Sequence, residues 1–338
     1  MSTTSPKPVI RDVARVAGVS IPTVSRVLTG AARVSEDKRE RVLRAIEELK
    51  YRPSAAARAL VAGQPSLIAV LAGNTSRYGY AETIRGVEQA AREAGYLVTI
   101  TVIESADPET VERALGTVLN QPLAGIVVLK FDPPGVQAVH RLPKDIPAVS
   151  ISGIRESGPP QAVLDEGQAA QEVVERLLAL GHATVHHVRV PPSRDEDGRT
   201  TGWRDALIAA GAPVPEILDA SWDPESGERI GEILAVDPSV TAVFCGNDEI
   251  AMGVVRGLAN GHRAVPEEVS VVGFDDHPLA RLWTPPLSTV RQDFAGLGGR
   301  AFALLARALK GEDVPDFSSE TPTLILRSST APPPKPAG

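Results

Sequence analysis

The chain is poor in cysteine and in aromatic residues, and it contains no long apolar run. Cys245 is the single cysteine among 338 residues, which excludes a disulfide framework and a metal site built from cysteines. No segment reaches the roughly 18 apolar residues of a membrane span, and no apolar signal core stands near the N-terminus. These absences predict a cytoplasmic protein without a membrane partner, in which Cys245 is a small buried residue.

Charge is distributed unevenly along the chain. Residues 1–63 carry 12 Lys and Arg against 6 Asp and Glu, a net charge of +6, whereas the remainder has a net charge of −13. A basic segment attached to an acidic body suits local attraction to the phosphates of DNA. The length also exceeds that of one domain, and it leaves enough chain after a small head for two lobes with their own cores.

The first segment has the apolar periodicity of a helix-turn-helix. A first helix is indicated by apolar residues that share one face: Ile10, Val13, Ala14 and Ala17. Gly18 supplies a turn. Ser20 then caps a second helix that has Pro22 in its first turn, where a missing N–H costs little.

The second helix has the composition of a helix that contacts bases. Three apolar residues face the core: Val24, Val27 and Leu28. On the opposite side Pro22 and Arg26 are four residues apart, so an apolar ring and a guanidinium share the face that a major groove would meet. A third helix, with Ser35 as N-cap, completes the core through an apolar stripe: Val42, Leu43, Ile46 and Leu49. The same spacings also fit a small helical hairpin without DNA, and the local positive charge favours DNA.

The rest of the chain alternates strand-like and helical segments. Strands are indicated by apolar runs at 67–71, 96–103, 125–129, 148–151, 184–190, 242–245 and 269–274. Helical stretches lie between and after them at 82–93, 109–119, 168–180, 202–210, 226–234, 249–258 and 297–309. This alternation predicts an α/β fold with parallel sheets covered by helices on both faces.

Residues 10–60 resemble the DNA-binding head of the lactose-repressor and galactose-repressor family. The resemblance rests on T-V-S-R-V at 23–27, on Tyr51 and Pro53 of a Y-x-P motif, and on A-R-x-L at 57–60. It implies a short hinge helix that forms only on the dimer and DNA, with Leu60 inserted into the minor groove. Pattern and resemblance together predict DNA contacts from Ser20, Ile21, Pro22, Thr23, Ser25, Arg26, Arg33, Tyr51, Ser54, Ala57 and Leu60.

Two positions depart from the head of that family. Val9 stands where a Thr usually caps the first helix. Lys50 replaces the usual Gly after the third helix, so a left-handed C-cap there would be strained. Neither change removes a side chain expected to contact bases.

The resemblance extends to about residue 330 and implies a head followed by a bilobed domain. The two lobes are similar to those of periplasmic sugar-binding proteins, each a doubly wound parallel sheet, and the chain crosses between them three times. The expected boundaries are a helix-turn-helix domain over 1–53, a hinge helix and linker over 54–65, an N-lobe over 66–160 and 293–320, a C-lobe over 161–292 and 321–330, and a disordered tail over 331–338.

Ligands of such sheets bind beyond the carboxyl ends of the strands. The runs FCGNDEIAMG, VSVVGFDD, TPPLSTVRQ and SWDPESG resemble the family's effector-domain motifs. Strand ends and resemblance together imply an effector cleft lined by Asn74, Tyr80, Arg199, Trp222, Asn247, Asp275 and Gln292. An aromatic face combined with carboxylates, amides and an Arg suits a carbohydrate. Asp248 and Asp276 are instead expected to cap the helices that follow them.

The first loop of the cleft departs from the family's S-N-P-F-F. Residues 76–80 are Ser-Arg-Tyr-Gly-Tyr, which adds the cation of Arg77. Gly153 stands where many sugar-binding members have a polar or charged residue, and Asp197 stands where Arg is common. Fewer charged donors at these two positions favour a neutral sugar over an anionic one.

Three classes of function are compatible with parts of the sequence. A solute-binding receptor would require a signal peptide, and a nucleotide-dependent enzyme would require the glycine fingerprint at 296–301 to follow a first strand. His182, His186 and His187 have metal-like spacing, but a strand between them would direct their side chains apart. The sequence therefore predicts a repressor of carbohydrate-use genes. It would act as a homodimer on a near-palindromic operator under a sugar effector, without enzymatic activity, metal or cofactor.

Overall fold

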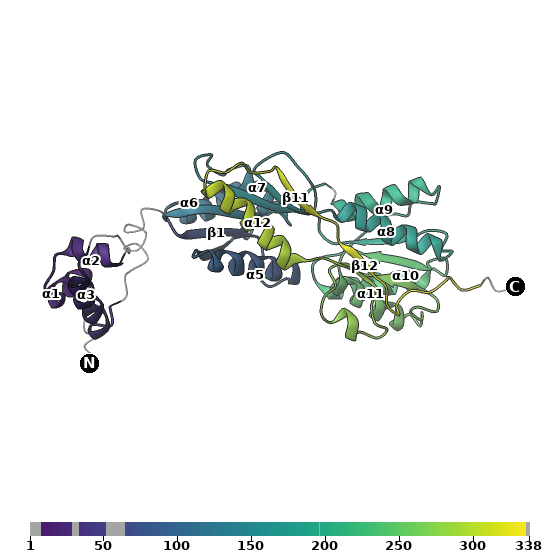
Figure 1. Ribbon diagram of the computed structural model, residues 1–338. Helices are drawn as coiled ribbons and strands as arrows, with labels where there is room; N and C mark the ends of the chain where they lie inside the picture. The colour runs from purple at the N-terminus through teal and green to yellow at the C-terminus, as the bar shows by residue number, and fades with distance from the viewer. Residues whose placement is uncertain (1–7, 29–33, 52–64, 196, 336–338) are drawn as a thin grey trace. The chain divides into compact units, whose positions relative to one another are not determined.

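The computed structural model describes residues 8–28, 34–51, 65–195 and 197–335 (Figure 1). The chain divides into two units, Met1–Ser66 and Leu67–Gly338. No helix in the described ranges combines the length and the hydrophobicity that crossing a bilayer demands.

The described residues of the first unit contain three helices: α1 (Ile10–Ala17), α2 (Ile21–Leu28) and α3 (Glu36–Glu48). Their core holds the residues Val13, Ala14, Ala17, Val24, Val42, Ala45 and Tyr51. The expected stripe of α3 is wrong at Leu43, which is 51% exposed, because the helix turns Ala45 inward instead.

The ends of these helices show how the two departures are accommodated. The Asp12 carboxylate accepts the N–H of Val9 at 3.0 Å and so supplies a polar contact that the Val9 side chain cannot make. Lys50 has a φ of 48°, which confirms the left-handed conformation expected after α3. The Ser20 hydroxyl lies 2.9 Å from the Thr23 hydroxyl, so it bonds a side chain rather than a backbone N–H.

The first lobe of the second unit contains a six-stranded parallel sheet in the order β11-β5-β4-β3-β1-β2. Its strands are β1 (Leu67–Ala72), β2 (Leu97–Val102), β3 (Leu123–Leu129), β4 (Ala148–Ser152), β5 (Gln161–Leu164) and β11 (Phe317–Glu320). Four helices cover it: α5 (Tyr78–Glu93), α6 (Pro108–Leu119), α7 (Pro133–Val139) and α12 (Phe294–Leu309). Successive residues of β1 face opposite sides, so Ile68 and Val70 pack with α5 and α12, and Ala69 and Leu71 pack with α6 and α7.

The second lobe contains a four-stranded parallel sheet in the order β7-β6-β8-β9. Its strands are β6 (His186–Arg189), β7 (Leu218–Asp219), β8 (Ala242–Cys245) and β9 (Ser270–Val272). Its helices are α8 (Glu166–Ala179) and α9 (Gly198–Ala209) on one face, and α10 (Pro224–Val236) and α11 (Asp248–Asn260) on the other, with a 3₁₀ turn at Ala280–Leu282. Because helices cover both faces of this sheet, β8 and β9 are buried along their whole length.

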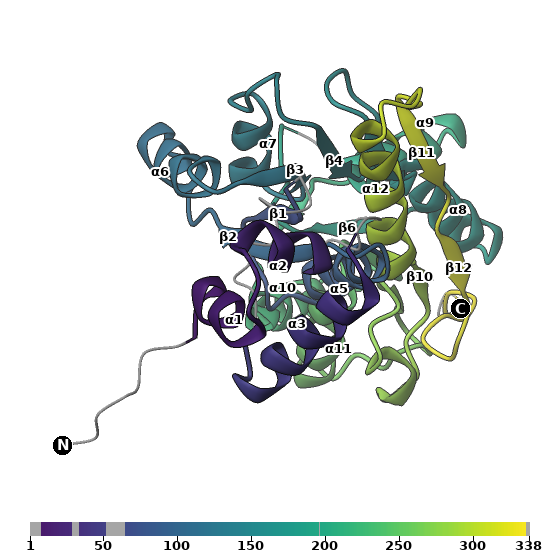
Figure 2. The same cartoon turned by 60° about the vertical axis from the view of Figure 1, so that its left-hand side comes forward.

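Three crossings join the lobes, one of them later than expected. The chain passes from β5 to α8, from β10 (Thr289–Arg291) to α12, and from β11 to β12 (Thr323–Ile325). Residues 161–164 were expected in the C-lobe, but they form β5 in the sheet of the N-lobe, because all four are buried between β4 and β11. The yellow segment that contains β11 and β12 runs from one lobe to the other (Figures 1 and 2).

The end of the chain is attached to the C-lobe at the start of the expected tail. The Ser270 hydroxyl donates to the Ala331 carbonyl at 2.9 Å, and the Ala331 N–H lies 3.0 Å from the same hydroxyl oxygen. The disorder expected over 331–338 therefore does not begin at Ala331.

Helices α10 and α11 pack backbone against backbone through glycines. A Cβ atom on Gly257 would stand 2.0 Å from the Glu228 carbonyl oxygen, and one on Gly231 would stand 2.4 Å from that of Val254. Both contacts are with rigid main chain, so only glycine fits.

We expect Gly257→Ala to lower the free energy of unfolding by about 1–3 kcal/mol, because the added methyl group must separate α10 from α11. Urea unfolding followed by tryptophan fluorescence measures this, since all three tryptophans lie in the second unit. Gly116→Ala in α6 is the matched control, as its Cβ would meet no atom within 4 Å. Equal stability of the two variants would contradict the packing argument.

Candidate functional site

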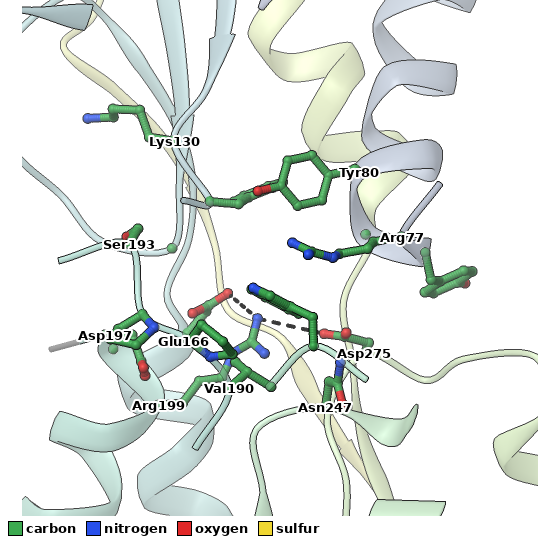
Figure 3. Close-up of a pocket in the computed structure, with 18 of the residues that line it drawn as sticks. Arg77, Tyr80, Lys130, Glu166, Val190, Ser193, Asp197, Arg199, Asn247 and Asp275 are labelled. Carbon is green, nitrogen blue, oxygen red and sulfur yellow. Dashed lines mark hydrogen bonds and ion pairs between the residues drawn. The ribbon is translucent and has the colours of Figure 1, made fainter. Parts of the chain in front are cut away.

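A cleft with an empty volume of about 770 Å³ lies between the two lobes of the second unit (Figure 3). The N-lobe contributes Arg77, Tyr78, Gly79, Tyr80, Lys130, Phe131, Gly153 and Phe294 to its lining. Ile154, next to Gly153, also belongs to the N-lobe. The C-lobe contributes Glu166, Val190, Pro191, Pro192, Ser193, Arg194, Asp197, Gly198, Arg199, Trp222, Asn247, Glu249 and Asp275.

The floor of the cleft is built around Arg199. Its guanidinium donates to Glu166 Oε1 at 2.8 Å and to the Gly246 carbonyl, and it lies 3.7 Å from Asp275 Oδ1. It also lies over the Phe274 ring, 4.5 Å from the centroid. Burial raises the pKa of Asp275 to about 7, although the nearby Arg199 opposes the shift. The floor therefore presents a fixed cation beside a carboxyl group that titrates near neutrality.

Gln292 lies behind this floor rather than on it. Its amide Nε2 donates to Asp275 Oδ1 at 2.7 Å, the side chain is 5% exposed, and it does not line the cleft. Within the described part of the chain its Oε1 has no hydrogen-bond partner. Gln292 thus positions Asp275, and it differs in this respect from the lining role expected of it.

The cap of α11 is also placed differently from the expectation. Asn247 Oδ1 accepts the Ile250 N–H at 2.8 Å, so Asn247 both caps the helix and lines the cleft. Asp248, expected as the cap, is buried and accepts the His277 N–H at 2.6 Å and the Thr289 hydroxyl at 2.5 Å. It therefore joins the loop after β9 to the start of strand β10 (Thr289–Arg291).

The adjacent residues Asp275 and Asp276 both have a strained backbone, and their side chains contact different partners. Their φ angles are 107° and 52°, which is unusual for residues other than glycine. Asp276 accepts from Arg291 at 2.7 Å and from Arg327 at 2.5 Å, and these arginines belong to β10 and to the segment after β12. Burial alone would raise the pKa of Asp276, but the two arginines outweigh it and lower the pKa. Asp276 does not cap a helix, in contrast to the expectation. The loop that places Asp275 in the cleft is thus tied to two crossings.

Asn74 shapes the N-lobe loop instead of lining the cleft. Its Oδ1 accepts the N–H groups of Ser76 at 2.8 Å and Arg77 at 2.9 Å, the pattern of an Asx turn. The turn places Arg77 at the N-cap of α5, and its guanidinium carbon lies 4.1 Å from the ring centroid of Trp222. Tyr80 does line the cleft, and its hydroxyl donates to Asp132 at 2.5 Å.

A charged cluster that the sequence patterns did not indicate lies on the far side of the cleft. Lys130 Nζ lies 2.9 Å from Glu156 Oε2, and Arg194 donates to the same oxygen. Lys130 follows β3 directly, so the rule that selected Asn74 could also have selected Lys130. Burial lowers the pKa of Lys130 against the effect of Glu156. The cluster joins the two lobes, because Arg194 follows β6.

In the first unit, α2 presents the face expected to meet DNA. Ile21 is 41% exposed, Pro22 and Arg26 are exposed, and Val24 is fully buried. Thr23 and Ser25 are half-buried. Ser20 is exposed. Tyr51 packs in the core with 7% exposure. The remaining predicted DNA contacts lie outside the described residues: Arg33, Ser54, Ala57 and Leu60.

The three histidines whose spacing resembles that of metal ligands, His182, His186 and His187, have separate surroundings. His182 bonds Thr241 and Ser270, whereas the His187 ring stacks on Phe244 with centroids 4.9 Å apart. Burial lowers the pKa values of all three imidazoles. Among the described residues no three His, Cys, Asp or Glu side chains gather as a metal site would require.

Comparison with known proteins connects this architecture to a family. The model of bacterial regulatory proteins of the lacI family matches residues 9–54, and the model of the periplasmic binding protein-like domain matches residues 174–330. Catabolite control protein A of Priestia megaterium is 30% identical over 95% of this chain and 98% of its own length. The chain belongs to the LacI family. The transcriptional repressor PurR of Klebsiella pneumoniae is 32% identical over 95% of this chain and 96% of its own length.

Solved structures of the LacI family agree over nearly the whole chain. The Lac repressor dimer bound to operator and the anti-inducer ONPF has a TM-score of 0.89 at 27% identity, covering 96% of this chain and all of that one. The regulator CelR in complex with cellobiose has a TM-score of 0.70 at 28% identity, covering 95% and 99%. The expected family and fold class are confirmed, and the protein is a DNA-binding transcriptional regulator.

The two ion pairs of Asp276, with Arg291 and Arg327, lead to a prediction about stability. Asp276→Asn should lower the free energy of unfolding by about 1–3 kcal/mol at pH 7, because two arginines lose a charged acceptor. A lowered pKa in the folded state contributes stability above the unfolded pKa and loses it as pH falls. The deficit of the variant should therefore shrink below about pH 4.

Urea titrations at several pH values test this prediction. The control is Asp219→Asn, which removes the acceptor of Arg189 at a carboxylate that is 65% exposed and should change stability little. A deficit for Asp276→Asn that stayed constant from pH 7 to pH 3 would contradict the assigned role.

Proposed function

We propose that the chain is a homodimeric repressor whose affinity for a near-palindromic operator is controlled by a carbohydrate in the interlobe cleft. The observation that carries the proposal is the floor formed by Glu166, Arg199 and Asp275, whose paired charges line the cleft. Relatives support the ligand class: one is the Escherichia coli ribose operon repressor, and one solved neighbour holds cellobiose.

The floor has the chemistry that sugar hydroxyl groups require. Each hydroxyl donates one hydrogen bond and accepts others, so it needs acceptors and donors side by side. Asp275 and Glu166 supply acceptors, Arg199 supplies donors, and the Asn247 amide has N–H groups left after its oxygen caps α11. Trp222 also lines the cleft and adds an aromatic surface for C–H groups, beside the Arg77 guanidinium that stacks on its ring.

The loop of Asp275 and Asp276 supports the route from ligand to DNA. A ligand that binds Asp275 acts on a loop whose next residue holds β10 and the segment after β12. An effector changes operator affinity only if it binds the two lobe arrangements unequally. The hinge helix predicted over 54–60, which would pass the change to the head, lies outside the described residues and stays a prediction.

The face of α2 generates a prediction for base recognition. Arg26→Ala should lower affinity for the operator by about 1–3 kcal/mol, because a bidentate contact to guanine is lost, while affinity for random DNA changes less. An operator can be selected from a randomised palindromic library and measured by fluorescence anisotropy at fixed salt. The control is Arg39→Ala on α3, which should weaken both duplexes alike. Equal losses on the two duplexes for Arg26→Ala would remove it from base recognition.

The pKa of Asp275 generates a prediction for ligand binding. Because that pKa is about 7, the carboxylate is more fully ionised at pH 8 than at pH 6, and only the ionised form accepts from hydroxyls with both oxygens. Carbohydrate affinity should therefore rise between pH 6 and pH 8. Calorimetry with a sugar found to bind measures the slope, and Asp275→Asn should remove it. The same slope in the variant would show that another group titrates.

A further inference from the structure

Four cations line the cleft, and three of them already have carboxylate partners. Lys130 and Arg194 share Glu156, and Arg199 pairs with Glu166. Arg77 is the fourth, and no carboxylate of the described chain lies within ion-pairing distance of its guanidinium.

Arg77 is held in a way that leaves part of its donor capacity available. Its backbone N–H is fixed by Asn74, and its guanidinium stacks on the indole of Trp222, with 4.1 Å from the guanidinium carbon to the ring centroid. Stacking uses the face of a guanidinium, whereas its N–H groups lie in the plane and point outward. Figure 3 shows the side chain directed into the cleft, between Tyr80 and Asp275.

The Tyr80 hydroxyl accepts a hydrogen bond from the Arg77 side chain, and this contact uses part of the donor capacity of Arg77. The Tyr80 hydroxyl donates to Asp132, and the other oxygen of Asp132 accepts the Gly135 N–H at 2.9 Å. Burial and the charge of Asp132 raise the pKa of Tyr80, so its hydroxyl keeps the proton. Arg77 is therefore a preoriented guanidinium that lines the cleft, bonds Tyr80 and has no carboxylate partner among the described residues for its other donors.

We propose that Arg77 selects a carbohydrate that carries an anionic oxygen group, either a carboxylate or a phosphate. This inference rests on the proposed function of the cleft. The hydroxyl groups would meet Glu166, Arg199 and Asp275. The anionic group would lie at Arg77, because the carboxylates of the floor repel it from the other end. The proposal reverses the expectation of a neutral sugar, which considered only the donors missing at Gly153 and Asp197.

Calorimetry on the full chain without DNA tests the proposal with matched ligands. Glucose, galactose and mannose are each compared with their hexuronate and their 6-phosphate, so the two anionic arms identify the anionic group. We expect one anionic form to bind about tenfold or more tightly than its neutral parent. The preference should disappear in Arg77→Gln and survive in part in Arg77→Lys, which keeps the charge without the fork.

The ratio of anionic to neutral affinity separates recognition from a structural role. If Arg77 only linked the lobes through Trp222, Arg77→Gln would change all affinities alike and leave the ratio intact, which overturns the proposal. The control is Arg92→Gln on the same helix, whose guanidinium is 64% exposed and pairs with Glu88. Neutral sugars that bind as tightly as their anionic forms also overturn it.

Inorganic phosphate provides a second readout that needs no sugar. Thermal unfolding of wild type, Arg77→Gln and Arg92→Gln is compared in phosphate and in chloride at equal ionic strength. Phosphate should raise the melting temperature of wild type and of Arg92→Gln more than that of Arg77→Gln. Equal shifts in all three overturn the proposal. If an anionic sugar binds through Arg77 but operator affinity does not respond, this inference stands and the proposed regulatory function fails.

Discussion

The cleft depends on the burial of one permanent cation. Arg199 has only 14% of its side chain exposed, and a guanidinium does not lose its proton in a protein, so acceptors must surround it. They come from the start of α8, the end of β8 and the loop after β9, through Glu166, Gly246 and Asp275. Three elements of the C-lobe are therefore held together by one charge, and the floor is organised before a ligand binds.

The carboxylates that surround Arg199 lie close to the segments that connect the two lobes. Glu166 stands at the beginning of α8, directly after the first crossing. Asp275 bonds Gln292 beside the second crossing, and its neighbour Asp276 bonds Arg291 and Arg327 beside the second and third. A ligand that alters the charge balance around Arg199 thus acts on residues attached to every crossing. Such a connection is what allostery between cleft and head requires, because coupling travels only through elements that both sites bias.

How far the sequence predicts the fold depends on the kind of strand. Some buried strands are continuous apolar runs, such as the run at 242–245 that coincides with β8, whereas the interior strand β6 is His-His-Val-Arg. Strands at an edge or within a crossing carry no such pattern. β11 is Phe-Ser-Ser-Glu and β10 has three residues, so both are stabilised by pairing with distant segments, β5 and β12. A pattern along one segment cannot show a partner far away in the chain. For this reason β5, with four residues, was assigned to the wrong lobe.

The candidate site shows the complementary limit, because position along the chain does not determine where a polar side chain points. Asn74 and Asn247 both follow a strand, and both accept backbone N–H groups of the turn that comes next. In Asn247 those N–H groups belong to the first turn of α11, so the residue stays at the mouth of the cleft. In Asn74 they belong to the loop before α5, and the cleft receives Arg77 instead. Unpaired N–H groups at helix starts compete with ligands for these short side chains. The side chain that faces the cleft then belongs to a following residue that accepts no backbone N–H group, such as Arg77 after Asn74.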